Sequence, residues 1–194
     1  MTQGEPRRRA LRADAQRNHE DIRRAALAVF REGGLTVPLE LVAKAAGVSK
    51  GTIYHRFAGR DALVDAVIDD LARLHIDELI ADCNAIVNPA DRFEHYLDGM
   101  WRLQYDEPAV CDVVTRQVPD SAQLSELCAR ASGVAERYLS DAQAGGSIRP
   151  ELTSADVFRF IRDRGIVFRA EGRPDRSDDE RHRRYLIDGL LARR

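Results

Sequence analysis

The fold is decided by residues 42–57, which read Val42-Ala43-Lys44-Ala45-Ala46-Gly47-Val48-Ser49-Lys50-Gly51-Thr52-Ile53-Tyr54-His55-Arg56-Phe57. Apolar residues at helical spacing lead up to Gly47, where the small apolar face ends. A glycine there permits the left-handed backbone that closes a helix and turns the chain. Ser49 is a good N-cap for a second helix, on which Ile53 and Phe57 lie four residues apart and point inward. The stretch therefore predicts two short helices around a tight turn.

The second of these helices, residues 50–57, has an outer face rich in hydrogen-bond donors. Lys50, Thr52, His55 and Arg56 remain on that face once the apolar residues point inward. A major groove admits a short helix of this kind, with a buried stripe on one side and donors on the other. The pattern predicts a helix-turn-helix in which residues 50–57 form the recognition helix.

This motif is similar to the N-terminal domain of the tetracycline-repressor (TetR) family. The resemblance runs from about Ile22 to Leu63 and is strongest over residues 46–54, Phe57 and residues 60–63. Three positions depart from the usual family pattern: Pro38, Arg56 and Gly59. The resemblance implies that Arg60, the basic residue opening the fourth helix, contacts a DNA phosphate. It also implies that the last two helices form a dimer seam.

Charge is distributed unevenly along the chain. Residues 1–60 carry twelve Lys or Arg and six Asp or Glu, for a net charge of +6, although the whole chain has a net charge of −2. A basic N-terminal part on an acidic body directs one end toward a polyanion. The alternative is that the uneven charge arose by chance on a solvated surface. This alternative fits poorly, because the positive part coincides with the predicted helix-turn-helix.

Cysteine usage and hydropathy narrow the class of protein. Three cysteines without C-x-x-C spacing, Cys83, Cys111 and Cys128, predict reduced thiols rather than disulfides or a metal site. No apolar run approaches the roughly 18 residues of a membrane span, and no signal-peptide pattern precedes the first helix. We therefore expect a cytoplasmic protein with no cofactor and no metal.

Hydrophobic periodicity predicts an all-α, nine-helix TetR-like fold, with a helix-turn-helix head and a helical-bundle body. We expect a basic, flexible arm over residues 1–17, a DNA-binding domain over 18–60, and a ligand-binding and dimerisation domain over 61–194. The arm either reaches DNA or serves only as a solvated tail. The fourth helix is expected to run unbroken from Gly59 to about Ala85.

The motif nominates residues for DNA binding. Thr52 and His55 are expected to contact base edges, Lys50 to contact a base or a phosphate, and Tyr54 and Arg56 to contact phosphates. For Tyr54 the alternative is packing on the first helix. The full predicted DNA-binding set is Lys50, Gly51, Thr52, Tyr54, His55, Arg56 and Arg60.

The apolar stripes of the body predict an effector cavity and a homodimer seam. An effector cavity is expected to be apolar with a few convergent polar groups. Its predicted residues are His75, Leu79, Cys83, Leu97, Met100, Trp101, Gln104, Val113, Arg116, Leu127, Ala131, Ile161, Arg164 and Phe168. The predicted seam comprises Val157, Ile161, Tyr185, Leu186, Gly189 and Leu190.

Polar residues within the apolar stripes leave alternatives open. His75 is either a satisfied core histidine or a ligand contact. A guanidinium within an apolar stripe needs a partner, so Arg164 either faces an acidic effector or pairs with an acid across the dimer seam. Together with Arg116 it favours an effector with a carboxylate or another acceptor on an apolar body.

These patterns predict a homodimeric, ligand-responsive transcriptional regulator, most often a repressor, that binds a palindromic DNA operator and is released by a small-molecule effector. The alternative is a DNA-binding dimer whose body binds a protein or nothing. An enzyme fits poorly, because the chain has neither a Gly-x-Ser-x-Gly nor a His-Glu-x-x-His motif, and no Gly-rich phosphate loop.

Overall fold

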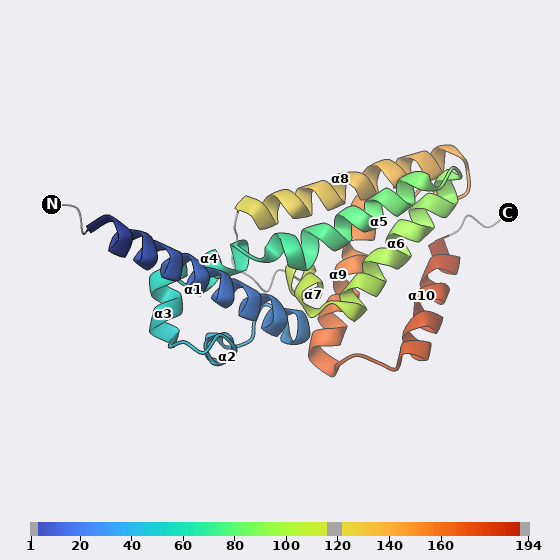
Figure 1. The fold of residues 1–194 in the computed structure, drawn as a ribbon. Coiled ribbons are helices and arrows are strands. Elements are labelled where there is room, and N and C mark those ends of the chain that lie inside the picture. Colours follow the sequence, from blue (N-terminus) through green and yellow to red (C-terminus); the bar gives the residue numbers. More distant parts are fainter. Residues whose placement is uncertain (1–3, 116–121, 191–194) are drawn as a thin grey trace.

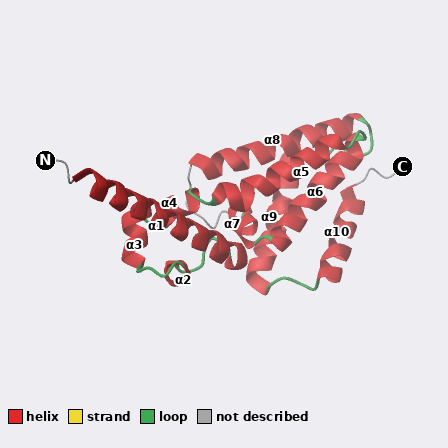
Figure 2. Cartoon of the chain, viewed as in Figure 1, coloured by secondary structure: helices red, strands yellow, loops and turns green. Residues whose placement is uncertain are grey.

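The computed structural model describes residues 4–115 and 122–190, and this part of the chain contains helices but no strands (Figures 1 and 2). Ten α-helices and one π-helical turn follow one another: α1 (Gly4–Gly33), α2 (Leu39–Ala45), α3 (Lys50–Phe57), α4 (Arg60–Asp65), η1 (Asp69–Arg73), α5 (Leu74–Ala85), α6 (Pro89–Asp106), α7 (Pro108–Val114), α8 (Ala122–Ala144), α9 (Ser154–Glu171) and α10 (Arg176–Leu190). None of the described helices is long and apolar enough to span a membrane. The all-α prediction is confirmed.

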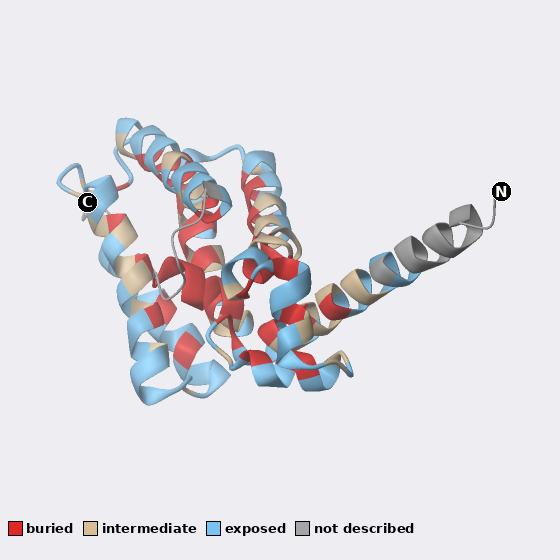
Figure 3. Cartoon of the chain, turned by 90° about the vertical axis from the view of Figure 1, so that its left-hand side faces the viewer, coloured by how far each residue is buried: buried red, intermediate tan, exposed pale blue. Residues whose placement is uncertain are grey.

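The first helix is longer than the sequence indicated. α1 begins at Gly4 rather than near Asn18, so most of the segment predicted to be a flexible arm is helical in this structure. Figure 3 shows buried segments where α1 meets the other helices and through the interior of the body.

The head is built as the motif predicts. Ile22 and Phe30 of α1 pack with Val42 of α2 and with Ile53 and Phe57 of α3, and all five side chains are buried. Removing such side chains from water is worth about 1.5–3 kcal/mol each. Packing against the long α1 therefore holds two helices that are too short to be stable alone.

The segment predicted as one helix over residues 59–85 is broken, which raises the helix count from the expected nine to ten. The break coincides with a contact from α1: Arg23 Nε donates to the carbonyl oxygen of Ala66 at 3.1 Å, and the same side chain pairs with Asp70. After α4 the chain continues through the π-helical turn η1 into α5. Arg23 thus connects α1 to the segment that links head and body.

The body is a bundle in which α6 packs against α5, α8 and α9 (Figure 1). The buried stripe of α6 contains Phe93, Leu97, Met100 and Trp101, as the helical spacing predicted. The caps read from the sequence are present: Asn88 accepts from the N–H of Ala90, and Thr153 and Asp156 form a capping box. This bundle holds the cavity described below.

Candidate DNA-reading helix and effector cavity

The tight turn before α3 has the backbone that the sequence predicted. Gly47 adopts a φ of +66°, and the N–H of Val48 donates to the carbonyl oxygen of Ala43 at 3.0 Å. The Ser49 hydroxyl caps α3 by accepting from the N–H of Thr52 at 3.1 Å. The turn and its cap fix the direction of α3 relative to α2.

The outer face of α3 is open to solvent. Tyr54, His55 and Arg56 are exposed, and Thr52 is half-buried beside Ser49. Tyr54 is 50% exposed, which disfavours the alternative that it packs against α1. Lys50 Nζ donates to Glu40 at 2.6 Å, so this lysine must leave an exposed ion pair before it can contact DNA. Such exposed pairs cost little to break.

Arg60, predicted to contact a DNA phosphate, points into the head in this structure. Its guanidinium is half-buried and donates to the carbonyl oxygens of Leu35 and Val37, in the loop between α1 and α2. Both terminal nitrogens are therefore occupied within the head. In this structure Arg60 fixes the entry into α2 rather than presenting a free cation beside α3.

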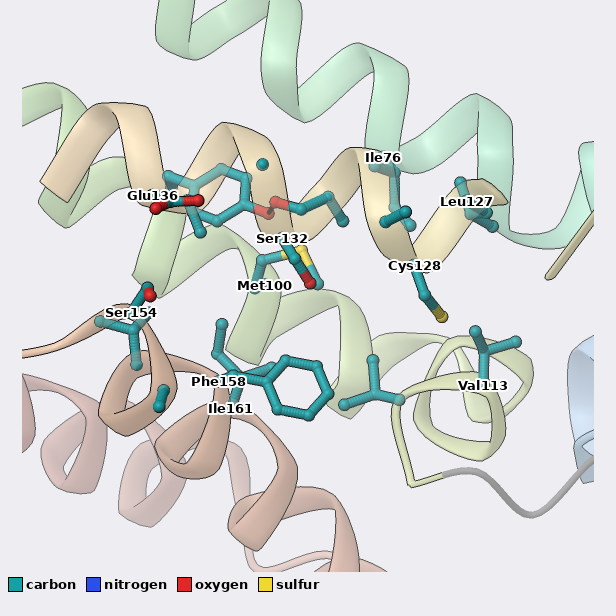
Figure 4. A pocket seen from close by; sticks show the side chains of 18 residues that line it. Ile76, Met100, Val113, Leu127, Cys128, Ser132, Glu136, Ser154, Phe158 and Ile161 are labelled. Carbon is teal, nitrogen blue, oxygen red and sulfur yellow. Dashed lines mark hydrogen bonds between the residues drawn. The ribbon is translucent and has the colours of Figure 1, made fainter. Parts of the chain in front are cut away.

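A cavity of about 450 Å³ lies in the body between α5, α6, α7, α8 and α9 (Figure 4). This volume is within the roughly 300–1,000 Å³ of small-molecule sites. Five of the predicted cavity residues line it, namely Met100, Val113, Leu127, Ala131 and Ile161. The remaining described wall consists of Ile76, Tyr96, Val114, Cys128, Ala129, Ser132, Gly133, Ala135, Glu136, Ser154, Ala155, Val157 and Phe158.

Other predicted cavity residues are packed between helices instead. Leu79 is packed against Gly99, where an added Cβ would lie 2.3 Å from the leucine Cδ1. Cys83, Leu97 and Trp101 are fully buried in the core. None of these four side chains lines the cavity, because each fills a helix–helix contact.

The polar residues in the stripes also have structural partners. Gln104 Nε2 donates to the carbonyl oxygen of Ile161 at 3.0 Å and so joins α6 to α9. His75 lies between Glu78 and Glu107, with nitrogen–oxygen distances of 3.7 and 3.8 Å, and is off the cavity wall. Arg116 lies outside the described residues.

Arg164 and Phe168 belong to a second hollow, of about 530 Å³, between α9 and α10. Arg164 pairs with Asp179 of the same chain, and Asp179 also accepts from Arg183 Nε at 2.9 Å. Arg183 in turn pairs with Asp98 of α6. The acid that pairs with Arg164 in this structure is therefore intramolecular, and Arg164 lies off the α5–α9 cavity.

The residues predicted for the dimer seam fall into two groups. Val157 and Ile161 are buried within the protomer and line the cavity, so they are not available to a partner. On α10, Tyr185, Leu186 and Gly189 are exposed and Leu190 is half-buried. The exposed apolar face of α9 is formed instead by Ile166 and Val167, which the sequence analysis did not nominate.

One buried carboxylate joins the head to the body. Asp112 on α7 is 1% exposed, accepts from the backbone N–H of Leu35 at 2.6 Å, and pairs with Arg169 of α9. The next residue, Val113, lines the cavity, and the Leu35 carbonyl accepts from Arg60. Asp112 therefore connects a helix that lines the cavity to the loop before α2.

Comparisons with known proteins agree with this architecture. Residues 22–67 match the family model described as "Bacterial regulatory proteins, tetR family". The HTH-type transcriptional repressor KstR2 of Mycobacterium tuberculosis is 32% identical over 155 residues, which cover 71% of this chain and 72% of that protein.

Solved structures share the fold. The ketosteroid transcriptional regulator KstR2 of Mycobacterium tuberculosis aligns with a TM-score of 0.66 and 19% identity, covering 90% of this chain and 95% of that one. AibR in complex with isovaleryl coenzyme A and operator DNA aligns with a TM-score of 0.67 and 18% identity, covering 90% and 98%. The chain belongs to the TetR family of bacterial transcriptional regulators, which bind DNA and are not enzymes.

Proposed function

We propose that this regulator is a homodimeric repressor that binds a palindromic operator through α3 and leaves it when a small molecule fills the α5–α9 cavity. The observation that carries the proposal is the position of Asp112 on α7. Its carboxylate accepts from Leu35 in the α1–α2 loop, and the next residue of α7, Val113, lines the cavity. A ligand that prefers one position of α7 would favour one position of the head by its differential affinity.

The roles proposed for the α3 residues rest on the helix-turn-helix pattern, and the exposure of Tyr54, His55 and Arg56 supports them. Thr52 and His55 are proposed to contact base edges, and Tyr54 and Arg56 to contact phosphates. Lys50 is proposed to exchange Glu40 for DNA. For Arg60 we propose an indirect role, because its guanidinium positions the loop before α2.

Two copies are needed for the proposed operator. One recognition helix contacts few base pairs, whereas two related by a two-fold axis double the contacts and read half-sites about 34–36 Å apart or a multiple of that distance. The exposed apolar residues of α9 and α10, Ile166, Val167, Tyr185 and Leu186, are the proposed seam.

The test is operator binding measured at several salt concentrations, on DNA selected by the full chain from a random-sequence library. His55→Ala should relax the preference at one operator position. Arg56→Ala should weaken all sequences about equally and lower the salt slope by roughly one unit. The matched control is Arg137→Ala, an exposed arginine of the body, which should leave the slope unchanged.

The proposal fails if Arg56→Ala affects only one operator position, or if a monomer of the native chain binds the selected operator with full affinity. Retention of the operator by a chain whose cavity is demonstrably filled would reject the ligand-responsive part. That result would favour a DNA-binding dimer without an effector.

A further inference from the structure

The cavity wall is apolar at one end and acidic at the other. Figure 4 shows Val113 and Leu127 at one end, and Glu136 and Ser154 at the opposite end. Among the described lining residues, Glu136 is the single aspartate or glutamate, and there is no lysine, arginine or histidine. The charge available to a ligand from the described wall is therefore negative.

The other polar atoms of the wall do not offset this charge. Tyr96 donates its hydroxyl to the carbonyl oxygen of Ala131 at 2.8 Å, so that donor is already used. Ser132 precedes Glu136 by four residues on α8, which places the two on the same face of the helix. In Figure 4 Ser132 lies between the acidic end and the apolar end.

Glu136 itself is available to a ligand. Its side chain is solvent-exposed, and no ion pair joins it to another described residue. Arg92 and Arg137 line a neighbouring surface hollow together with Glu136, but Arg92 pairs with Asp141 at 3.7 Å and neither arginine lines the cavity. A carboxylate at the rim of an apolar cavity can accept hydrogen bonds from a cationic group, and such bonds are about twice as strong as neutral ones.

We propose, resting on the proposed function, that the effector is a cationic amphiphile: an aliphatic or aromatic body along the Val113 end and a protonated amine against Glu136. A ligand carboxylate, or the phosphates of a coenzyme A thioester, would meet a like charge there. Arg164 and Arg116 in the apolar stripes had favoured an acidic effector. Arg164 lies in the other hollow, so that expectation loses its principal residue.

The proposal is tested with four probes that share an eight-carbon chain: n-octylamine, 1-octanol, octanoate and octanoyl coenzyme A. The amine is protonated near pH 7.5, since alkylammonium groups such as that of lysine have a pKa of about 10.4. Calorimetric titration of the full chain measures each affinity. Glu136→Gln removes the charge at an exposed position, and Glu126→Gln, an exposed glutamate of the same helix that does not line the cavity, is the matched control.

We expect n-octylamine to bind the native chain more tightly than the other three probes. Glu136→Gln should lower its affinity about fivefold, the upper range for a solvent-exposed ion pair, and change that of 1-octanol less than twofold. Glu126→Gln should change neither. Tighter binding of octanoate or octanoyl coenzyme A, an unchanged amine affinity in Glu136→Gln, or no binding by any probe would each overturn the proposal.

Operator release, measured on the same samples, separates this inference from the proposed function. If the amine binds through Glu136 and the operator stays bound, the ligand class stands and the ligand-responsive repressor fails. If octanoate releases the operator instead, the repressor stands and the cationic ligand class is overturned.

Discussion

The Asp112 contact between head and body can be tested by Asp112→Ala. This carboxylate is 1% exposed, accepts from the Leu35 N–H at 2.6 Å, and pairs with Arg169. Leu35 is itself buried, so truncation leaves its backbone N–H without an acceptor and without water. Arg169 is 33% exposed and can turn to solvent, so its loss is smaller.

The expected cost follows from these two partners. A hydrogen bond to a charged group contributes about 1.5–3 kcal/mol, and an orphaned buried donor costs about 1–3 kcal/mol. Because these figures describe the same lost bond, they do not add. With up to about 1 kcal/mol more for the partly exposed Arg169 pair, we expect about 2–4 kcal/mol for Asp112→Ala. Asp112→Asn keeps an oxygen acceptor for Leu35 and loses mainly the partly exposed ion pair, so about 1 kcal/mol is expected.

Urea unfolding measures both variants, with Asp106→Asn as the control. Asp106 pairs with Arg176 on the surface, so its removal should cost no more than about 1 kcal/mol. The expected order of destabilisation is Asp112→Ala, then Asp112→Asn, then Asp106→Asn. If Asp112→Ala costs no more than the control, the carboxylate does not hold the head to the body and the proposed path from cavity to α2 is refuted.

Further predictions concern the seam, the thiols and one carboxylate. Leu186→Asp should yield monomers in light scattering and lose operator affinity, and a tightly binding monomer would contradict the α9–α10 seam. Cys128 lines the cavity, whereas Cys83 is buried, and burial raises the pKa of Cys83 to about 11. Iodoacetamide at pH 8 should therefore modify Cys128 first, and a bound ligand should protect Cys128. Equal modification rates of the two thiols, measured by mass spectrometry, would refute this. Burial and then the neighbouring carboxylates raise the pKa of Glu94, so its ionisation above roughly pH 4.3 opposes folding. Glu94→Gln should therefore raise the free energy of unfolding at pH 7, and this gain should vanish on acidification below the unfolded pKa of about 4.3. A loss of stability at pH 7 would show that the charge is favourable.

The head could be predicted from the sequence because its determinants are local. Gly47 sets the turn and Ser49 caps the next helix. Ile53 and Phe57 define the buried side of that helix, which is eight residues long. Each feature acts over one or two helical turns, so no long-range packing has to be known. Arg60 is the exception, since its acceptors lie in a loop more than twenty residues earlier.

The break between α4 and α5 shows the limit of local patterns. The apolar spacing continues through residues 64–79, and nothing within the segment signals an interruption. The interruption coincides with Arg23, which approaches from α1 and occupies the carbonyl oxygen of Ala66. A contact from a distant helix thus accompanies the break in a segment whose own sequence favours one unbroken helix.

The cavity was the least predictable part, for a physical reason that concerns polar residues. In the sequence, polar side chains within apolar stripes were the candidates for ligand contacts. A polar group buried between close-packed helices must find a partner within the protein, as Gln104 does at the Ile161 carbonyl and Arg164 does at Asp179. A group reserved for a ligand must instead stay without such a partner when the ligand is absent. A polar group without a protein partner is tolerated only where water can reach it, which is the case at the edge of an apolar stripe. Glu136 and Ser154 are exposed and lie at such an edge of the cavity. In a helical regulator of this kind, polar residues bordering the apolar stripe are therefore better candidates for effector contacts than those at its centre.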